Sequence, residues 1–213
     1  MAINRKAPNR PPAARRADAV ARLLDELTER GVNYDEAAAP PHAVEGWHQD
    51  RQTVHLGDEP AGEPQPGGLF ERAVAMVDSY EFSDPRILQA AYRATGGLLG
   101  RVMVLEGRFL VFRFLMGVRI TDRLDERGAG ANGPEQRKGW SYQTLEGHIE
   151  EGRLTYEVAK ELDTGRVEFR IIAYSRKAPI ANPVYRIGFS VFARHTQLRF
   201  YRNALRRLQV LVQ

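Results

Sequence analysis

Residues 153–174 read RLTYEVAKELDTGRVEFRIIAY, and their regular alternation of apolar and polar side chains decides the fold class. The apolar side chains that share one face are Leu154, Tyr156 and Val158 in the first run and Val167, Phe169, Ile171 and Ala173 in the second. Between the runs, Asp163-Thr164-Gly165 has the composition of a tight turn. The pattern predicts an antiparallel hairpin of two strands, 153–160 and 166–174, with one face packed and the other in solvent.

The chain on the N-terminal side of this hairpin contains further strand-like segments. The predicted strands are 49–56, 100–105, 109–115 and 139–145, with Trp140, Tyr142 and Thr144 on one face of the last. The predicted connections are a hairpin turn at Glu106-Gly107-Arg108 and a long glycine-rich loop over 128–139.

Three segments have helical periodicity. Ala17–Gly31 and Leu69–Tyr80 are predicted helices, and Asp84-Pro85 is either a turn or the start of a short helix through Tyr92. The last predicted helix, Pro183–Leu211, has an apolar stripe of Val184, Ile187, Val191, Leu198, Tyr201, Leu205 and Leu208. Arg199, Arg202 and Arg206 lie together on another of its faces. A long helix with such a stripe needs an apolar surface to cover, and the sheet supplies one.

Residues 139–152, GWSYQTLEGHIEEG, carry a resemblance to a known family. The stretch resembles the signature of the family called domain of unknown function nineteen-ninety, in which glycine, an aromatic residue, tyrosine, threonine-leucine and glycine-histidine recur. Residues 50–57 (DRQTVHLG), 70–73 (FERA) and 173–178 (AYSRKA) resemble collinear segments of that family. The resemblance covers roughly residues 46–208; residues 95–117 match poorly, and the helix at 17–31 has no counterpart.

This resemblance implies a fold but no activity, because none is established for the family. Its element order is similar to that of START-like helix-grip proteins, in which a curved antiparallel sheet wraps a long C-terminal helix around a cavity. We therefore expect an α+β protein of this type with an extra N-terminal helix. The expected organisation is a disordered basic arm (1–16), the N-terminal helix with its loop (17–45) and one helix-grip-like domain (46–213).

The composition excludes several classes of protein. The chain has 213 residues, 43% of them hydrophobic, which is enough for one domain with a sizeable core. It has no cysteine, so disulfides, thiolate metal sites and thiol nucleophiles are excluded. The sequence contains neither the roughly 18-residue apolar run of a membrane helix nor a signal-peptide pattern, so the expected location is cytoplasmic. Neither a cofactor fingerprint nor a metal-binding histidine pair occurs, so no cofactor and no metal site are expected.

The net charge of +4 is unevenly distributed, because no acidic residue follows Glu168 while nine basic residues do. Such asymmetry is consistent with a polyanion or nucleic-acid partner for the basic helix and arm, or with an ordinary solvated helix face. Few aromatic side chains alternate with the arginines, which argues against nucleic acid.

His148 is the most distinctive ionisable residue. It lies between Gly147 and Glu150 in a predicted strand connection, where a carboxylate could orient its imidazole for acid–base chemistry. His148, Glu150 and Tyr142 are therefore the candidate catalytic residues. The alternative is that His148 and Glu150 fix the turn by bonding to backbone groups.

Six residues are candidates for ligand binding: Trp140, Tyr142, Thr144, Ser175, Arg176 and His195. The first three form an aromatic, hydroxyl-bearing strand face, which either lines a pocket or belongs to the core. Ser175 and Arg176 end a predicted strand. His195 falls on the predicted buried stripe of the last helix, where it is either a core residue or faces a cavity.

Three functional hypotheses follow. The first is a binding module whose internal cavity holds a small hydrophobic or amphipathic molecule. The second is a hydrolase or cyclase that uses His148, Glu150 and Tyr142. The third is polyanion binding through the basic helix. The sequence identifies no ligand, reaction or oligomeric state.

Overall fold

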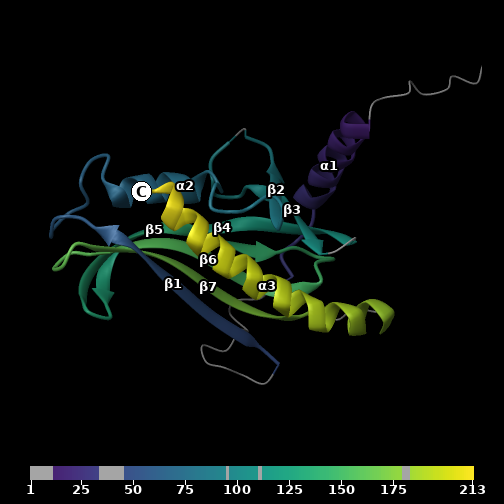
Figure 1. Ribbon diagram of the computed structural model, residues 1–213. Helices are drawn as coiled ribbons and strands as arrows, with labels where there is room; N and C mark the ends of the chain where they lie inside the picture. The colour runs from purple at the N-terminus through teal and green to yellow at the C-terminus, as the bar shows by residue number, and fades with distance from the viewer. Residues whose placement is uncertain (1–11, 34–45, 95, 110–111, 179–182) are drawn as a thin grey trace, which may run out of the picture.

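The computed structural model describes residues 12–33, 46–94, 96–109, 112–178 and 183–213 (Figure 1). The helices of this part are α1 (Pro12–Thr28), α2 (Leu69–Asp78) and α3 (Pro183–Leu211). The strands are β1 (His48–Asp58), β2 (Leu88–Tyr92), β3 (Val102–Phe109), β4 (Phe112–Gly130), β5 (Gly133–Thr144), β6 (Glu150–Glu161) and β7 (Arg166–Lys177).

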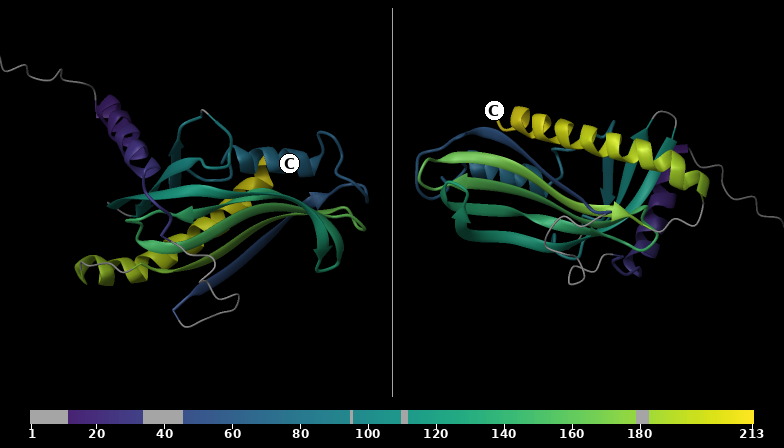
Figure 2. Two further views of the ribbon diagram at one scale, coloured as in Figure 1. Left: turned by 180° about the vertical axis from the view of Figure 1, so that it is seen from behind. Right: turned by 90° about the horizontal axis from the view of Figure 1, so that it is seen from below.

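The strands form one antiparallel sheet in the order β1-β7-β6-β5-β4-β3-β2. Strands β2 to β7 follow one another as a meander, and β1 pairs with β7 at the far edge. The sheet is strongly curled into a half-barrel, with α3 crossing its concave face (Figure 2). Register shifts between His55 and Gly57 in β1 and between Ile120 and Asp122 in β4 contribute to the curl, because a bulge bends its strand and increases the local twist.

The main core lies on the concave face, between the sheet and the helices α2 and α3. Its helical side chains are Phe70, Ala73 and Val77 of α2 and Phe200, Tyr201, Ala204, Leu205 and Leu208 of α3. The aromatic rings of the core form a continuous cluster: the centroid of Tyr156 lies 5.0 Å from that of Trp140 and 4.5 Å from that of Phe82. Edge and tilted ring contacts of this kind add to the stabilisation that burial alone provides.

The decisive stretch forms the predicted hairpin, since β6 and β7 are joined at residues 162–165 and pair throughout. The last helix has the predicted bounds, Pro183–Leu211. Its stripe is confirmed for Leu198, Tyr201, Leu205 and Leu208, all of which pack in or against the main core. The side chains of Val184, Ile187 and Val191 lie outside the described residues.

Two local predictions are wrong. Glu106-Gly107-Arg108 is not a turn, because β3 continues to Phe109 and pairs with β4 from Phe112. Residues 128–139 are not a loop, since β4 runs to Gly130 and β5 begins at Gly133. This ribbon is held by cross-strand ion pairs, such as Lys138–Asp125 at 3.2 Å and Arg137–Glu126 at 3.1 Å, which an apolar pattern cannot reveal.

Of the two alternatives for Asp84-Pro85, the turn is confirmed, and strand β2 follows it in place of a short helix. Pairing with β3 places Leu88 opposite Gly107 and Ala90 opposite Leu105. The tertiary partner, and not the local sequence, therefore selects the extended conformation.

Helix α1 packs on the outer face of the sheet. Leu24 and Leu27 form a second, smaller apolar cluster with Val104 and Leu145. Val104 points away from the main core, whereas its neighbours Met103 and Leu105 belong to that core. Both faces of the sheet are therefore buried at β3. The helix begins at Pro12, within the segment predicted as a disordered arm. Residues 1–11 and most of the loop predicted to follow the N-terminal helix lie outside the described residues.

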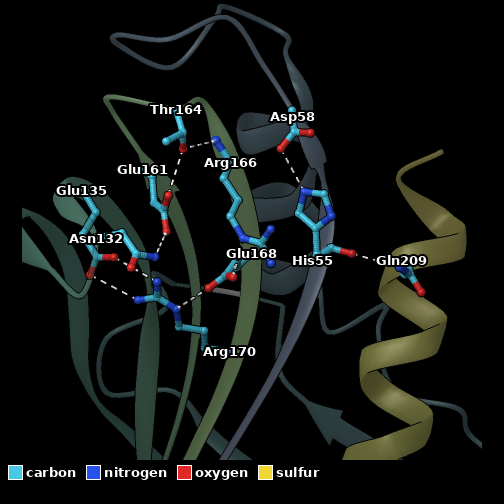
Figure 3. Close-up of polar contacts among 10 residues, drawn as sticks. All are labelled: His55, Asp58, Asn132, Glu135, Glu161, Thr164, Arg166, Glu168, Arg170 and Gln209. Carbon is cyan, nitrogen blue, oxygen red and sulfur yellow. Dashed lines mark hydrogen bonds and ion pairs between the residues drawn. The ribbon is translucent and has the colours of Figure 1, made fainter.

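The outer face of β5–β7 is polar as predicted, but part of it is buried rather than in solvent (Figure 3). The Arg170 guanidinium donates to both oxygens of Glu135, at 3.1 and 2.9 Å, and to Glu157 at 3.4 Å. Arg170, Glu135 and Glu157 are 6%, 3% and 2% exposed. Burial alone lowers the pKa of Arg170, but its hydrogen bond to Glu135 and the nearby carboxylates raise that pKa overall, so the guanidinium stays charged.

A second buried ion pair, between Lys160 and Glu59, lies at one end of the concave face. Lys160 Nζ donates to Glu59 Oε2 at 2.8 Å and to the Glu63 carbonyl at 3.0 Å, and Lys160 is fully buried. The other oxygen of Glu59 accepts the backbone N–H of Phe70 at 2.8 Å, in the first turn of α2. Glu59 thus joins the sheet to the N-terminus of α2, where a carboxylate is favoured.

Candidate functional site

A group of polar side chains interrupts the apolar interface between α3 and the concave face. We call Asp50, Tyr142, Glu150, Arg194 and Tyr201 the inner polar cluster. Glu150 shares its strand face with the core residues Leu154 and Tyr156, and Tyr142 shares its face with Trp140. Arg194 precedes Tyr201 by seven residues, or two helical turns, so both lie on one side of α3.

The ion pair between Asp50 and Arg194 ties β1 to α3. Arg194 contacts both carboxylate oxygens, with Nη2 donating to Asp50 Oδ1 at 2.5 Å and Nη1 donating to Oδ2. Nη1 also donates to Gln197 Oε1 at 2.9 Å. Asp50 is 8% exposed, and its hydrogen bonds raise the pKa of Arg194. A planar guanidinium matched to a carboxylate in this way is a strong, directional pair.

The carboxyl group of Glu150 lies near this ion pair without joining it. Burial raises the pKa of Glu150; Arg194 opposes that shift, Asp50 adds to it and Lys177 opposes it. Within the described part of the chain, the carboxyl group makes no hydrogen bond or ion pair, and the contacts of Glu150 run through its backbone. Glu150 is half-buried, so its carboxyl group can accept a hydrogen bond from a molecule bound beside it.

Tyrosine hydroxyls extend the cluster into the core. The hydroxyls of Tyr80 and Tyr156 lie 3.5 Å apart, and burial raises the pKa of Tyr142, Tyr156 and Tyr201 well above 10. These phenols are therefore neutral at physiological pH. The Tyr201 hydroxyl is buried and makes no hydrogen bond of ordinary geometry among the described residues, although Gln197 lies close to it.

His148 fixes the turn before β6. Its Nδ1 accepts the backbone N–H of Glu150 at 2.9 Å and lies 2.8 Å from the Glu150 carbonyl oxygen. Burial lowers the pKa of His148 to about 4, so the imidazole is neutral at pH 7. No described contact joins it to the Glu150 carboxyl group or to Tyr142. These contacts favour the turn-fixing alternative over a catalytic triad of these residues.

Trp140 and Thr144 are held by structural contacts. The Trp140 indole N–H donates to the Val77 carbonyl of α2 at 3.2 Å, and the residue is 1% exposed. The Thr144 hydroxyl contacts the Asn33 side chain and accepts the Gly152 N–H at 3.0 Å. Of the predicted aromatic strand face, Tyr142 alone belongs to the inner polar cluster.

Ser175 and Arg176 lie on opposite faces of β7. Ser175 is buried on the concave face, next along that face from Ala173 of the core. Arg176 is exposed on the outer face, where its guanidinium lies 4.6 Å from the centroid of the Trp47 ring and pairs with Glu151. The Trp47 ring stacks on Tyr174 at 4.4 Å, so Arg176 belongs to an outer-face stack.

The prediction that His195 lies on the buried stripe of α3 is wrong, because His195 is exposed. The preceding residue, Arg194, occupies the inward position through its pair with Asp50. Arg199, Arg202 and Arg206 are exposed together, as predicted, whereas Phe200 and Tyr201 are buried. Phe200 and Tyr201 therefore do not add exposed aromatic side chains to the basic face of α3.

Sequence reasoning missed Asp50, Arg194 and Tyr201 as site residues. Asp50 and Arg194 are 144 positions apart, and each has the local pattern of an ordinary surface residue. Two features of the sequence could have indicated this pair. Arg194 lies next to the apolar stripe of the last helix, and Asp50 is an acidic residue at the start of a strand with alternating side chains. Within the described residues, no group of three or more histidine, aspartate or glutamate side chains is arranged to hold a metal ion.

These observations define a class of protein: an α+β fold with a curled seven-stranded antiparallel sheet, a long C-terminal helix on its concave face and a polar cluster between the two. Residues 28–207 match the family described as Domain of unknown function (DUF1990), and the chain belongs to that family. The match starts at the end of α1, in agreement with the absence of a family counterpart for this helix.

Among solved structures, the chain is similar to the one titled "Crystal structure of Ara h 8.0201", with 13% sequence identity and a TM-score of 0.42. That alignment covers 78% of this chain and 98% of the other. No curated protein matches the sequence. In the part of α1 to α3 that the structure describes, no helix is long and apolar enough to cross a membrane.

Proposed function

We propose that this protein is a helix-grip binding module that holds a small hydrophobic or amphipathic molecule between α3 and the concave face of the sheet. The apolar part of the molecule would lie among the core side chains, and its polar end would meet the inner polar cluster. Binding sites for small molecules have this composition: mostly apolar walls with a few polar groups that fix orientation.

The single observation that carries the proposal is the Tyr201 hydroxyl, which is buried without a well-formed hydrogen bond to any residue that the structure describes. An unsatisfied buried hydroxyl costs about 1–3 kcal/mol, and native proteins rarely keep one without a reason. A bound molecule that supplies the missing partner is such a reason. The unpaired carboxyl group of Glu150 in the same cluster supports the same interpretation.

The enzymatic alternative, a hydrolase or cyclase using His148, Glu150 and Tyr142, has less support. It requires an imidazole free to exchange protons near the reacting atoms. The hydrogen-bonding of His148 is with the backbone of Glu150, and its lowered pKa makes it a weak base. We therefore retain ligand binding as the proposed function.

Titration with the neutral, environment-sensitive fluorophore Prodan tests the proposal. We expect saturable binding with one site per chain. Leu198→Trp should weaken binding at least tenfold, because Leu198 packs against the core from α3 and a larger side chain would fill the proposed site. Arg202→Trp, one turn further along on the exposed face of α3, is the matched control and should bind as the wild type does.

Circular dichroism melting of both variants would establish that they fold. Absence of saturable Prodan binding by the folded wild-type protein would contradict the proposal. So would equal binding by the two tryptophan variants, because the fluorophore would then bind elsewhere.

A further inference from the structure

Within the described residues, two polar groups of the inner polar cluster have no well-formed hydrogen bond of their own. They are the half-buried carboxyl group of Glu150 and the buried hydroxyl of Tyr201. Tyr201 is 1% exposed, so bulk solvent does not reach its hydroxyl. Both oxygens are acceptors, and a ligand group that donates hydrogen bonds would serve both.

Among the described residues, the cationic side chains near Glu150 are already engaged or solvated. Arg194 is committed to Asp50 through both terminal nitrogens, and one of these also donates to Gln197. Lys177, which faces Glu150 across the β6–β7 pair, is exposed at the end of its strand. An anionic ligand would have to displace Asp50 from Arg194 and would then lie beside a second carboxyl group, which is unfavourable in a buried site.

A positively charged ligand group meets the opposite situation. It would pair with the carboxylate of Glu150 directly and keep that group ionised, since a nearby opposite charge favours the charged form. Tyr142 and Tyr201 belong to the same cluster, and aromatic rings attract cations where a ring face is within reach. An ammonium group also has N–H donors for both unpaired oxygens.

We propose that the inner polar cluster selects amphipathic amines: molecules with an apolar body and a protonated amino group that pairs with Glu150 and donates to the Tyr201 hydroxyl. This inference rests on the proposed binding function and specifies the chemistry of its ligand. In this arrangement Glu150 supplies the charge, Tyr201 supplies a second acceptor, and the Asp50–Arg194 pair fixes the helix against β1.

Competition for bound Prodan by three probes of equal chain length tests the charge preference at pH 7. The probes are n-octylamine, 1-octanol and octanoate. We expect octylamine to compete at least tenfold more tightly than octanol, and octanoate to compete worst. The net charge of the protein is +4, so general electrostatic attraction would favour octanoate and cannot produce the expected order.

Two conservative variants locate the effect. Glu150→Gln should weaken octylamine competition about ten- to hundredfold and leave octanol unchanged, because a hydrogen bond to a charged group is lost. Glu151→Gln is the matched control, since Glu151 is the next residue, pairs with Arg176 and lies on the outer face. Tyr201→Phe should weaken octylamine several-fold by removing the second acceptor.

The outcomes separate this inference from the proposed function. If Prodan binds and octanol or octanoate competes as well as octylamine, the amine preference is overturned while ligand binding stands. Equal loss of octylamine binding in Glu150→Gln and Glu151→Gln would also overturn it. If Prodan does not bind at all, the proposed function fails first.

Discussion

Replacement of Lys160 by methionine should strongly destabilise the fold without changing its shape. Methionine approximates the length of the lysine stem and removes the ammonium group that pairs with Glu59 at 2.8 Å in a fully buried position. Glu59 would keep the backbone N–H donors of Phe70 and Gln65, at 2.8 and 3.3 Å. Removing one partner of a buried pair costs about 3–5 kcal/mol, and these remaining donors place Lys160→Met near the lower end, at about 3 kcal/mol.

The reverse replacement, Glu59→Gln, should cost more, about 5 kcal/mol, since the buried ammonium would lose its carboxylate partner and keep only neutral acceptors such as the Glu63 carbonyl oxygen at 3.0 Å. The double variant should be more stable than the sum of the single losses by about 2 kcal/mol, because neither unpaired charge remains. Urea unfolding at pH 7 measures all three free energies of unfolding. Additivity of the two losses to within about 0.5 kcal/mol would refute the reasoning.

The same pair makes a prediction about acid. Burial alone raises the pKa of Glu59, but the hydrogen bonds from Lys160, Phe70 and Gln65 outweigh it and hold this pKa below 4.5. Because the folded pKa is depressed, the stabilisation is present above about pH 4.5 and is lost as the pH falls through the folded pKa. Lys160→Met should flatten this loss in acid urea titrations, and an unchanged acid limb would count against the pair.

Three other predictions concern His148, Arg170 and Gly165. The pKa of His148 is about 4 in the folded protein and 6.5 in the unfolded chain, so the free energy of unfolding should fall by up to about 3 kcal/mol as the pH drops from 6.5 to 4. The urea midpoint of His148→Gln should not show this dependence on pH. Arg170→Leu should cost about 3–5 kcal/mol in urea unfolding, because the buried Glu135 would lose both of its short hydrogen bonds and keep only the ion pair with Arg137 at 3.5 Å. Arg170→Lys should recover only part of this loss because lysine cannot form the fork, and equal stability of the two variants would contradict the prediction. Gly165 has φ +81°, and a Cβ there would lie 1.8 Å from the Glu59 carbonyl oxygen, so Gly165→Ala should lower the calorimetric Tm by several degrees, whereas an unchanged Tm would show that the turn adapts.

The sequence predicts the elements whose burial is periodic. Strands β6 and β7 alternate because the concave face packs against helices, and α3 shows its stripe for the same reason. The polar β4–β5 ribbon escapes prediction, because its partners are charges on the opposite strand and not apolar residues on one face. Strand β2 escapes because five residues with no strong alternation become extended only when β3 pairs with them.

The candidate site was predicted only in part, for a geometrical reason. Tyr142 follows from strand alternation and Glu150 from its place beside His148 in the family-like motif, and both lie in the inner polar cluster. On α3, a shift of one residue corresponds to about 100° of rotation, so the stripe did not separate the exposed His195 from the inward Arg194. The pairing of Arg194 with Asp50 depends on β1 crossing to the far edge of the sheet, which no local pattern encodes.

The most direct test of the central claim is a crystal structure of the protein grown with n-octylamine. The account predicts the alkyl chain between α3 and the concave face, with the amino nitrogen within about 3 Å of the Glu150 carboxylate and the Tyr201 hydroxyl. An amine bound only on the outer surface, with side chains filling the space between α3 and the sheet, would contradict it.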